Sequence, residues 1–500
     1  MIPLMPISAS LAGVRLFTLS AREHDGGELS SRNWLHVTSG SAAGAWLGGA
    51  RAQFLRKESL SHEHIKTLST SNQRAPPKVC HHIRLDEPSL QCSGNGVFLV
   101  VKIYDGWTRQ SVRCNDSSNI FEDMSKTAFI TGANGISGSA ILEYLVQNTT
   151  ADDWSSIIVT SRSPFKTTVS DPRIRFIALD FTQDAKTLAE QMKDICAPVT
   201  HAYFCSYVHK DDFAELNAAN EALFENFLDS LEQVAKSLQN VTLQTGGKYY
   251  NVHLQPVPSP AREEDPRRQG PIENFYFPQE DKLASAQKGK SWSWNVIRPE
   301  AIVGSTSKPN GMNEALTIAI YFLVCRELDT EAPMPTNQRY WEGTDDVSDS
   351  NLTADLTIYT STNSKCANEA FNITNGDYFT WRYMWPRLAD YFNAKASTDQ
   401  KFTKPMPKEG DVQLENSFLE WSKDKREVWE SLCDRQGIAS AKQTFDFGTW
   451  AFQDWVFQRT WSATLSISKA RRYGWRGYVD SYDSFVRTFD KFKQFGLVPK

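Results

Sequence analysis

The sequence has few cysteines, and none of them are spaced as pairs. Its 500 residues contain 8 cysteines and no Cys-x-x-Cys pattern. This argues against the disulfide framework of a secreted protein and indicates reduced thiols in the cytosol. The adjacent residues Cys80, His81 and His82 suggest a zinc site, but the cysteine spacings match no finger or ribbon. We therefore predict a cytoplasmic protein without a bound metal.

Strong net charge and long apolar runs are also missing. A formal net charge of -5 gives no electrostatic basis for binding nucleic acid or an anionic membrane. The longest apolar run, residues 315–325, is about half of the roughly 20 residues that a membrane-spanning helix needs, so we expect a buried core helix there. With 40% hydrophobic and 23% charged residues the chain is near globular averages, which argues against disorder throughout.

Residues 1–123 differ in composition and hydrophobic patterning from the rest of the chain. They hold Gly/Ser/Ala stretches and scattered charges, with no sustained helical or strand period beyond the short segment 96–104. We assign them no fold and interpret them as an N-terminal extension that is disordered or the product of a mistaken start. Met124 stands directly before the first regular pattern, so we expect residues 1–123 to be dispensable for activity.

From residue 126 onward, apolar strands alternate with helical patterns. This order is typical of a parallel sheet with helices on both faces, a Rossmann-type doubly wound α/β fold. We predict an NADP-binding domain over residues 124–305 and a mostly helical substrate-binding cap over residues 306–500. The expected strands are 126–131, 156–160, 175–179, 200–205, 240–244 and 293–297, and the expected helices are 139–146, 185–196 and 215–238.

A spaced-glycine motif follows the first strand. Glycines permit a tight turn and close approach of the backbone to a pyrophosphate, which the N-terminus of the next helix attracts. Placed between a strand and a helix, the motif predicts dinucleotide binding. The residues that we expect to contact the cofactor here are Thr131, Gly132, Asn134, Gly135, Ile136 and Gly138.

The end of the second strand indicates which dinucleotide binds. Enzymes that use NAD usually place an acidic residue there, but this chain has Ser161, Arg162 and Ser163. A guanidinium group suits the 2′-phosphate of NADPH, so we predict NADPH as the cofactor. Asp180, followed by Phe181, ends the third strand and suits either a hydrogen bond on the adenine side or a helix cap.

One Tyr-x-x-x-Lys pattern, the common catalytic pair of short-chain dehydrogenases, occurs at Tyr391 and Lys395. It lies far beyond the predicted strands in an amphipathic helical segment. We interpret it as a coincidence.

Several ordered motifs together resemble one enzyme family. Residues 243–250 read LQTGGKYY and residues 274–281 read NFYFPQED, similar to the LQTGxKHY and NFYYxxED segments of the progesterone 5β-reductase/iridoid synthase-like enone reductases. Further similar segments are 298–304 and 368–377. The resemblance runs from about Met124 to the C-terminus. This family is a divergent branch of the short-chain dehydrogenases.

The resemblance implies the chemistry and the residues that perform it. In this family a separated lysine and tyrosine act together, and the matching positions here are Lys248 and Tyr276. NADPH would deliver hydride to the β-carbon of an enone, while the phenol stabilises charge on the carbonyl oxygen. Two residues depart from the family pattern, Tyr249 and Phe277, which puts the substrate range in doubt. The resemblance also implies cofactor contacts from Cys205, Ser206, Tyr207, Thr245, Gly246, Pro299 and Ile302.

Alternatives remain open at this stage. The same cofactor and phenol suit a carbonyl reductase or an epimerase/dehydratase-type enzyme, and a third reading is a cofactor-binding protein without turnover. The substrate is a small, largely apolar enone or carbonyl compound, and a role in specialised metabolism is compatible with the resemblance. The sequence leaves the oligomeric state open, with a homodimer as one alternative. For the late aromatics we favour core packing over a pocket lining: Trp450, Phe452, Trp455 and Phe457.

Overall fold

The computed structural model describes residues 125–210 and 212–500, together with the backbone of short strands in the first 124 residues. The chain divides into two compact units, Met1–Asn119 and Ile120–Lys500. The expectations for residues 1–123 and for the Cys80–His82 cluster fall outside the described residues. The strands of the first unit form a four-stranded antiparallel sheet and two hairpins: β1 (Ala9–Leu11), β2 (Val14–Ala21), β3 (Arg32–Ser39) and β4 (Leu55–Arg56); β5 (Leu90–Ser93) with β6 (Gly96–Leu99); and β7 (Lys102–Asp105) with β8 (Thr108–Ser111).

A seven-stranded parallel sheet forms the centre of the second unit. The strand order is β11-β10-β9-β12-β13-β14-β18. Its strands are short and apolar, and the inner ones are buried on both faces, as expected for a parallel sheet covered by helices. The bounds are β9 (Lys126–Ile130), β10 (Trp154–Ser161), β11 (Ile174–Ala178), β12 (His201–Phe204), β13 (Asn240–Gln244), β14 (Ser293–Pro299) and β18 (Glu369–Ile373).

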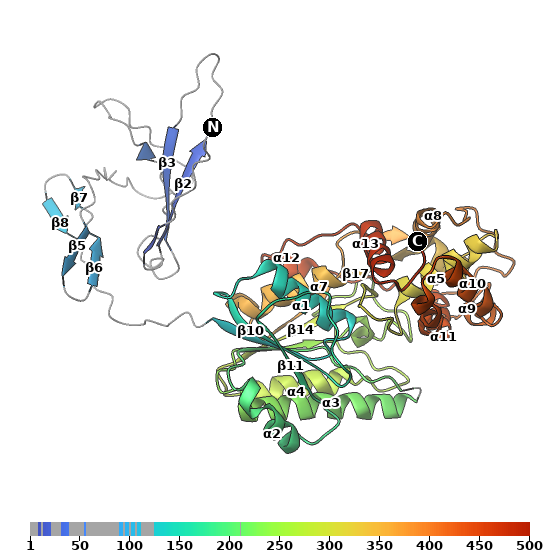
Figure 1. Cartoon of the computed structure of the whole chain (residues 1–500), viewed down its shortest axis with the longest axis horizontal. Coiled ribbons are helices and arrows are strands. Elements are labelled where there is room, and N and C mark those ends of the chain that lie inside the picture. Colours follow the sequence, from blue (N-terminus) through green and yellow to red (C-terminus); the bar gives the residue numbers. More distant parts are fainter. Residues whose placement is uncertain are drawn as a thin grey trace, which may run out of the picture. The chain divides into compact units, whose positions relative to one another are not determined.

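Helices cover both faces of this sheet (Figure 1). On one face α1 (Ile136–Asn148) packs beside α7 (Ser350–Thr362). On the other face lie α2 (Ala185–Cys196), α3 (Phe213–Val234) and α4 (Tyr276–Gln287). The predicted Rossmann fold is therefore confirmed. Strand order reverses between β9 and β12, the position where open α/β sheets bind ligands.

The seventh strand, β18, lies beyond the 124–305 range predicted for the cofactor domain. The chain leaves the sheet after β14, forms part of the cap, and returns through α7 to place β18 beside β14 in parallel. Short paired strands accompany this crossover: β15 (Ile302–Val303) with β17 (Ser348–Asp349), and β16 (Thr344–Asp345) with β19 (Phe379–Thr380).

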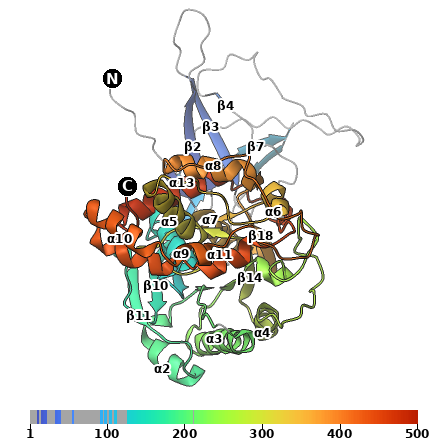
Figure 2. The same cartoon turned by 90° about the vertical axis from the view of Figure 1, so that its right-hand side faces the viewer.

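The cap is mostly helical and is built around α5 (Glu314–Glu327), as Figure 2 shows from the cap side. The residues of α5 from Glu314 to Cys325 are buried, which confirms the core helix expected at 315–325. Among the described residues no helix is both long and apolar enough to cross a membrane. The other cap elements are α6 (Gln338–Glu342), α8 (Trp381–Tyr391), α9 (Phe418–Ser422), α10 (Arg426–Arg435), η4 (Ala439–Phe447), α11 (Trp450–Phe457) and α13 (Ser481–Gln494). The short helix α12 (Ser468–Arg472) packs against β18 at the edge of the sheet.

Candidate active site

The glycine motif forms a tight turn between β9 and α1. Gly132 has φ +62°, and a Cβ there would lie 2.6 Å from the carbonyl oxygen of Cys205. A Cβ on Gly138 would collide with the carbonyl oxygen of Gly132. Both positions therefore require glycine, one for its backbone conformation and one for the close approach of α1 to the turn.

The N-terminus of α1 has the features of an anion site. Gly135 occupies the N-cap position, no side chain caps the helix, and the first turn holds no acidic residue. The backbone amides of Ile136, Ser137 and Gly138 have no hydrogen-bond partner among the described residues. These donors, at the positive end of the helix and at the switch point of the sheet, fit the pyrophosphate of a dinucleotide.

Asn134 ties the glycine turn to the loop after β10. Its Nδ2 donates to Ser161 Oγ at 3.1 Å and to Ser163 Oγ at 2.9 Å. Arg162, between the two serines, is exposed and makes no hydrogen bond or ion pair within the described part of the chain. Its guanidinium group is therefore available to an anionic ligand, on a loop whose position Asn134 fixes.

Asp180 and Phe181, which follow β11, differ in what they can offer a ligand. Asp180 Oδ1 accepts from the Thr182 amide at 3.1 Å, and the cap of α2 is Asp184, so the alternative of Asp180 as the helix cap is wrong. The ring of Phe181 is buried in the core, at 5.6 Å between centroids from Phe227. Only the Asp180 carboxylate and the backbone remain for a ligand here.

The segments that carry Lys248 and Tyr276 come together near the carboxyl end of β13. Lys248 lies in the 3-10 turn η2 (Gly247–Tyr250), and Tyr276 begins α4. A Cβ on Gly246 would lie 3.6 Å from the Tyr276 hydroxyl, so the phenol reaches the turn just before Lys248. Neither the hydroxyl nor the ammonium group hydrogen-bonds to any residue that the structure describes.

Asn274 holds these two segments together. Its Nδ2 donates to the carbonyl oxygen of Lys248 at 2.7 Å and to Asn251 Oδ1 at 3.0 Å. Its Oδ1 accepts from the amide of Tyr276 at 3.2 Å. One side chain thus fixes the backbone of both predicted catalytic residues.

A buried ion pair anchors the helix that carries Tyr276. Arg298 Nη2 contacts both carboxylate oxygens of Glu280 on α4 at 2.9 Å. The guanidinium group also lies 3.4 Å from the ring centroid of Tyr249 and donates to the hydroxyl of Tyr250 at 3.1 Å. Arg298 therefore connects β14, η2 and α4 in a bidentate arrangement that sets the position of α4.

Burial and aromatic side chains dominate the surroundings of Lys248 and Tyr276. Burial lowers the pKa of Lys248, and the nearby Glu300 carboxylate opposes this shift. Burial raises the pKa of Tyr276, with a smaller contribution from Tyr207. Trp455 and Phe452 lie over the ammonium group, with ring centroids 5.2 Å and 5.8 Å from Nζ. A cation facing two aromatic rings is stabilised without a hydrogen bond.

The late aromatic residues therefore divide between two roles. Phe457 is fully buried and Trp450 packs against the same cap core. Phe452 and Trp455 lie on another face of α11 and face Lys248, so for these two the expectation of core packing is wrong. Residues three apart on a helix lie on the same face, so Phe452 and Trp455 both face Lys248 while Trp450 and Phe457 pack in the cap core.

The remaining predicted cofactor residues border the same edge of the sheet. The amide of Cys205 donates to Thr131 Oγ1 at 2.9 Å, next to Gly132. Thr245 is fixed by its amide to the carbonyl oxygen of Ile297 at 2.9 Å, and the carbonyl oxygen of Pro299 faces Gly246. Partly exposed side chains at this edge are Ser206, Tyr207 and Ile302.

Two residues near Lys248 were not predicted as part of the site. His253 stacks edge-on against Trp455 at 5.6 Å, and its Nδ1 is buried without a partner among the described residues. Burial, Lys248 and Arg459 lower its pKa to about 3, so the ring is neutral. Glu300 lies behind the lysine turn. Burial raises its pKa to about 8. No local sequence pattern marks His253 or Glu300 as a site residue. Glu300 does lie within the segment 298–304, which resembles the enone reductase family.

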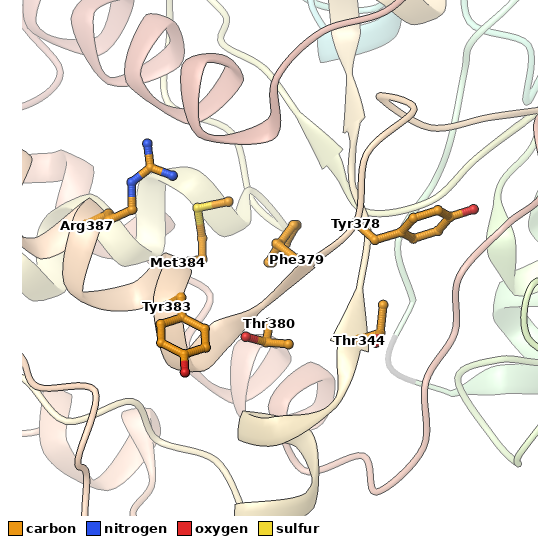
Figure 3. A pocket seen from close by; sticks show the side chains of 7 residues that line it. All are labelled: Thr344, Tyr378, Phe379, Thr380, Tyr383, Met384 and Arg387. Atoms are coloured by element: carbon orange, nitrogen blue, oxygen red, sulfur yellow. The ribbon is translucent and has the colours of Figure 1, made fainter.

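Other candidates lie elsewhere. Tyr391 bonds to Asp490 and Lys395 pairs with Asp329 at 2.6 Å on the cap surface, which agrees with a coincidental Tyr-x-x-x-Lys match. A surface hollow of about 360 Å³ on the cap shares no residue with the predicted site (Figure 3). Its lining residues are Thr344, Tyr378, Phe379, Thr380, Tyr383, Met384 and Arg387.

Comparisons with known proteins identify the family of the chain. A family model described as the PRISE-like Rossmann-fold domain matches residues 128–499. Short chain dehydrogenase gsfE of Penicillium aethiopicum is 70% identical over 377 residues, which cover 75% of this chain and 100% of that protein. The 3-oxo-Delta(4,5)-steroid 5-beta-reductase of Arabidopsis thaliana is 29% identical over 402 residues, covering 79% of this chain and 98% of the relative.

One solved structure extends the comparison to the fold. An epimerase from Methanothermobacter thermautotrophicus superposes with a TM-score of 0.52 at 14% identity, over 74% of this chain and 93% of that chain. This likeness concerns the fold alone. The family model and the 70% identical relative establish the assignment. The chain belongs to the PRISE-like family of short-chain dehydrogenases, a family of oxidoreductases.

Proposed function

We propose that the protein is an NADPH-dependent enone reductase that performs 1,4-reduction of an activated carbon–carbon double bond. The observation that carries this proposal is the pairing of Lys248 and Tyr276 by Asn274. Both side chains keep their hydrogen-bonding groups unused by the described residues, at the edge of the sheet where a Rossmann fold binds its nicotinamide cofactor.

The geometry supports separate roles for Tyr276 and Lys248. When bound, NADPH supplies a hydride to the β-carbon of the substrate. Tyr276 donates a hydrogen bond to the carbonyl oxygen, where negative charge grows as the hydride arrives, and an apolar site strengthens that bond. The Lys248 ammonium group lowers the cost of negative charge at the phenol and the oxygen. The resulting enolate takes a proton from solvent water at the α-carbon, which completes the reduction.

The choice of NADPH is supported by the loop after β10. No acidic residue stands at residues 161–163 to bind the ribose hydroxyls that distinguish NADH. Arg162 is exposed, without a partner among the described residues, and Asn134 fixes the two serines that flank it. A guanidinium fork of this kind binds a 2′-phosphate in a bidentate manner.

A small, largely apolar substrate is supported by the cap. Phe452 and Trp455 cover Lys248, and Tyr207 and Phe275 lie beside Tyr276, with a Tyr207–Phe275 centroid distance of 6.3 Å. Aromatic walls with few polar groups suit a drug-sized apolar ligand. Relatives named a steroid 5-beta-reductase and an 8-oxocitronellyl enol synthase support a conjugated carbonyl compound as the substrate class.

The test is turnover of 2-cyclohexen-1-one with NADPH, with the product identified. Saturated ketone is the expected product. Allylic alcohol would indicate a carbonyl reductase. Absence of any product with a panel of enones and aldehydes would indicate a protein without turnover. Tyr276→Phe should lower kcat at least about a hundredfold and leave the NADPH dissociation constant within about twofold. Turnover equal to the wild type in this variant would remove Tyr276 from the mechanism.

A further inference from the structure

The carboxyl group of Glu300 rests against the turn that carries Lys248. Glu300 follows β14 and is 7% exposed. A Cβ on Gly247 would overlap Glu300 Oε2, so the carboxyl lies directly on the backbone of η2, one residue before Lys248. The absence of a side chain at Gly247 creates the space that the carboxyl fills.

Two cations interact with the Glu300 carboxyl. Arg459 Nη1 is 3.8 Å from Oε1, and Lys248 is near enough to act on the carboxyl through its charge. No described residue donates a hydrogen bond to the carboxyl oxygens. The carboxyl and the Lys248 ammonium group form no direct ion pair, so they interact through the low-dielectric interior.

The other buried carboxyls near this pair are occupied elsewhere. Asp345 Oδ2 accepts from the Tyr340 hydroxyl at 2.6 Å, and Asp346 Oδ2 accepts from the Leu465 amide at 3.0 Å. Glu314 Oε2 accepts from Gln453 at 2.8 Å. The titratable groups around the pair are Arg459 after α11, His253 after η2, Glu314 on α5, Tyr340 on α6, Asp345 and Asp346 at β16, and Tyr276 with Tyr207 beside the phenol.

We propose that Glu300 is a positioning residue for Lys248: its carboxyl keeps the lysine in the ammonium form and supports the backbone of the turn that presents it. Of the four buried carboxyls, Glu300 is the one in contact with the lysine turn. Its role in turnover rests on the proposed function, since Lys248 matters there as a cation. Its effect on the lysine proton does not depend on any reaction.

The direction of the pH dependence follows from the two pKa values. Burial lowers the pKa of Lys248 and raises that of Glu300 to about 8. Below about pH 7 the carboxyl is mostly protonated and contributes little charge. As the pH rises through about 8 the carboxyl ionises and holds the lysine proton. Glu300→Gln removes this charge, so Lys248 should lose its proton about one pH unit earlier, with little change below pH 7.

Competitive labelling tests this on the full chain without substrate. Lys248 acetylation by acetic anhydride is followed by mass spectrometry from about pH 6 to about pH 11, because only the neutral amine reacts. We expect the labelling midpoint to fall by about one unit in Glu300→Gln and to stay in place in the matched control Glu314→Gln. An unchanged midpoint in Glu300→Gln, or an equal fall in the control, overturns the proposal.

A second variant moves the carboxyl instead of neutralising it. Gly247→Ala places a methyl group where Oε2 lies, so the charge is displaced and retained. We expect a fall of the Lys248 midpoint in the same direction, and this variant carries the test if Glu300→Gln fails to fold by circular dichroism. In turnover with 2-cyclohexen-1-one, Glu300→Gln should lose activity about tenfold above pH 8 and little below pH 7. A wild type without turnover would refute the proposed function, while the labelling result would still decide this inference.

Discussion

Asn274 offers the most direct test of how the site is assembled. Its amide makes three hydrogen bonds of 3.2 Å or shorter, to the carbonyl oxygen of Lys248, to Asn251 Oδ1 and from the amide of Tyr276, and a longer one to the carbonyl oxygen of Tyr249 at 3.5 Å. Asn274→Ala removes all three and leaves polar backbone groups unpaired. At about 1 kcal/mol for each bond, we expect a loss of about 3 kcal/mol in the free energy of unfolding.

The same change should reduce turnover beyond its effect on stability. Without the Asn274 hydrogen bonds, the positions of η2 and the start of α4 are no longer fixed relative to each other. A shift of about 1 Å at a reacting group costs on the order of a hundredfold in rate. We expect kcat for enone reduction to fall between about tenfold and a hundredfold. NADPH affinity should change less than about threefold, because the glycine turn and Arg162 are not contacted by Asn274.

Two further variants make the measurement specific. Asn274→Asp keeps the acceptor for the Tyr276 amide but turns its second carboxylate oxygen toward two acceptor oxygens, so it should cost at least as much stability as Asn274→Ala. Asn217→Ala removes one hydrogen bond, to the carbonyl oxygen of Glu273, without touching either predicted catalytic residue. It should cost about 1 kcal/mol of stability and leave kcat unchanged. If urea titration shows that Asn274→Ala is less stable but its kcat equals that of the wild type, the Asn274 hydrogen bonds have no part in positioning Lys248 and Tyr276.

Two other predictions concern the cofactor loop and the anchor of α4. Arg162→Glu should raise the KM for NADPH at least about tenfold and leave that for NADH within about twofold, and a parallel rise of both would show that Arg162 does not meet the 2′-phosphate. Glu280→Gln leaves the buried Arg298 guanidinium group without its countercharge and should cost about 3–5 kcal/mol of unfolding free energy. A cost below about 1 kcal/mol would mean that Tyr249 and Tyr250 satisfy the arginine on their own.

Much of the fold could be read from local patterns. Residues 185–196 and 240–244 form a helix and a strand at the predicted bounds, because a hydrophobic period and clear boundaries coincide there. The seventh strand was not predicted. Its residues, EAFNI, do not alternate between polar and apolar as those of 240–244 do, and the strand forms because the edge of β14 is available for pairing.

The site divides in a similar way. The glycine turn and Arg162 each come directly after a strand, so their roles can be predicted from the local sequence. Lys248 and Tyr276 became candidates through family resemblance, since they are far apart in the chain and share no local pattern. Asn274 and Glu300 act through contacts with a turn from another part of the chain, and no spacing rule reports such contacts. Trp455 differs from Trp450 only in the face of α11 that it occupies, which depends on the packing of the cap.

The late position of β18 in the chain affects how the protein is made. Until residue 373 has left the ribosome, residues 295–299 of β14 have no neighbour on their outer side, and their backbone amides and carbonyls face water. Such an open strand can recruit other chains. The seven-stranded sheet is therefore complete only after much of the cap has been synthesised, and until then the open edge of β14 is a place where partly folded chains can pair with one another.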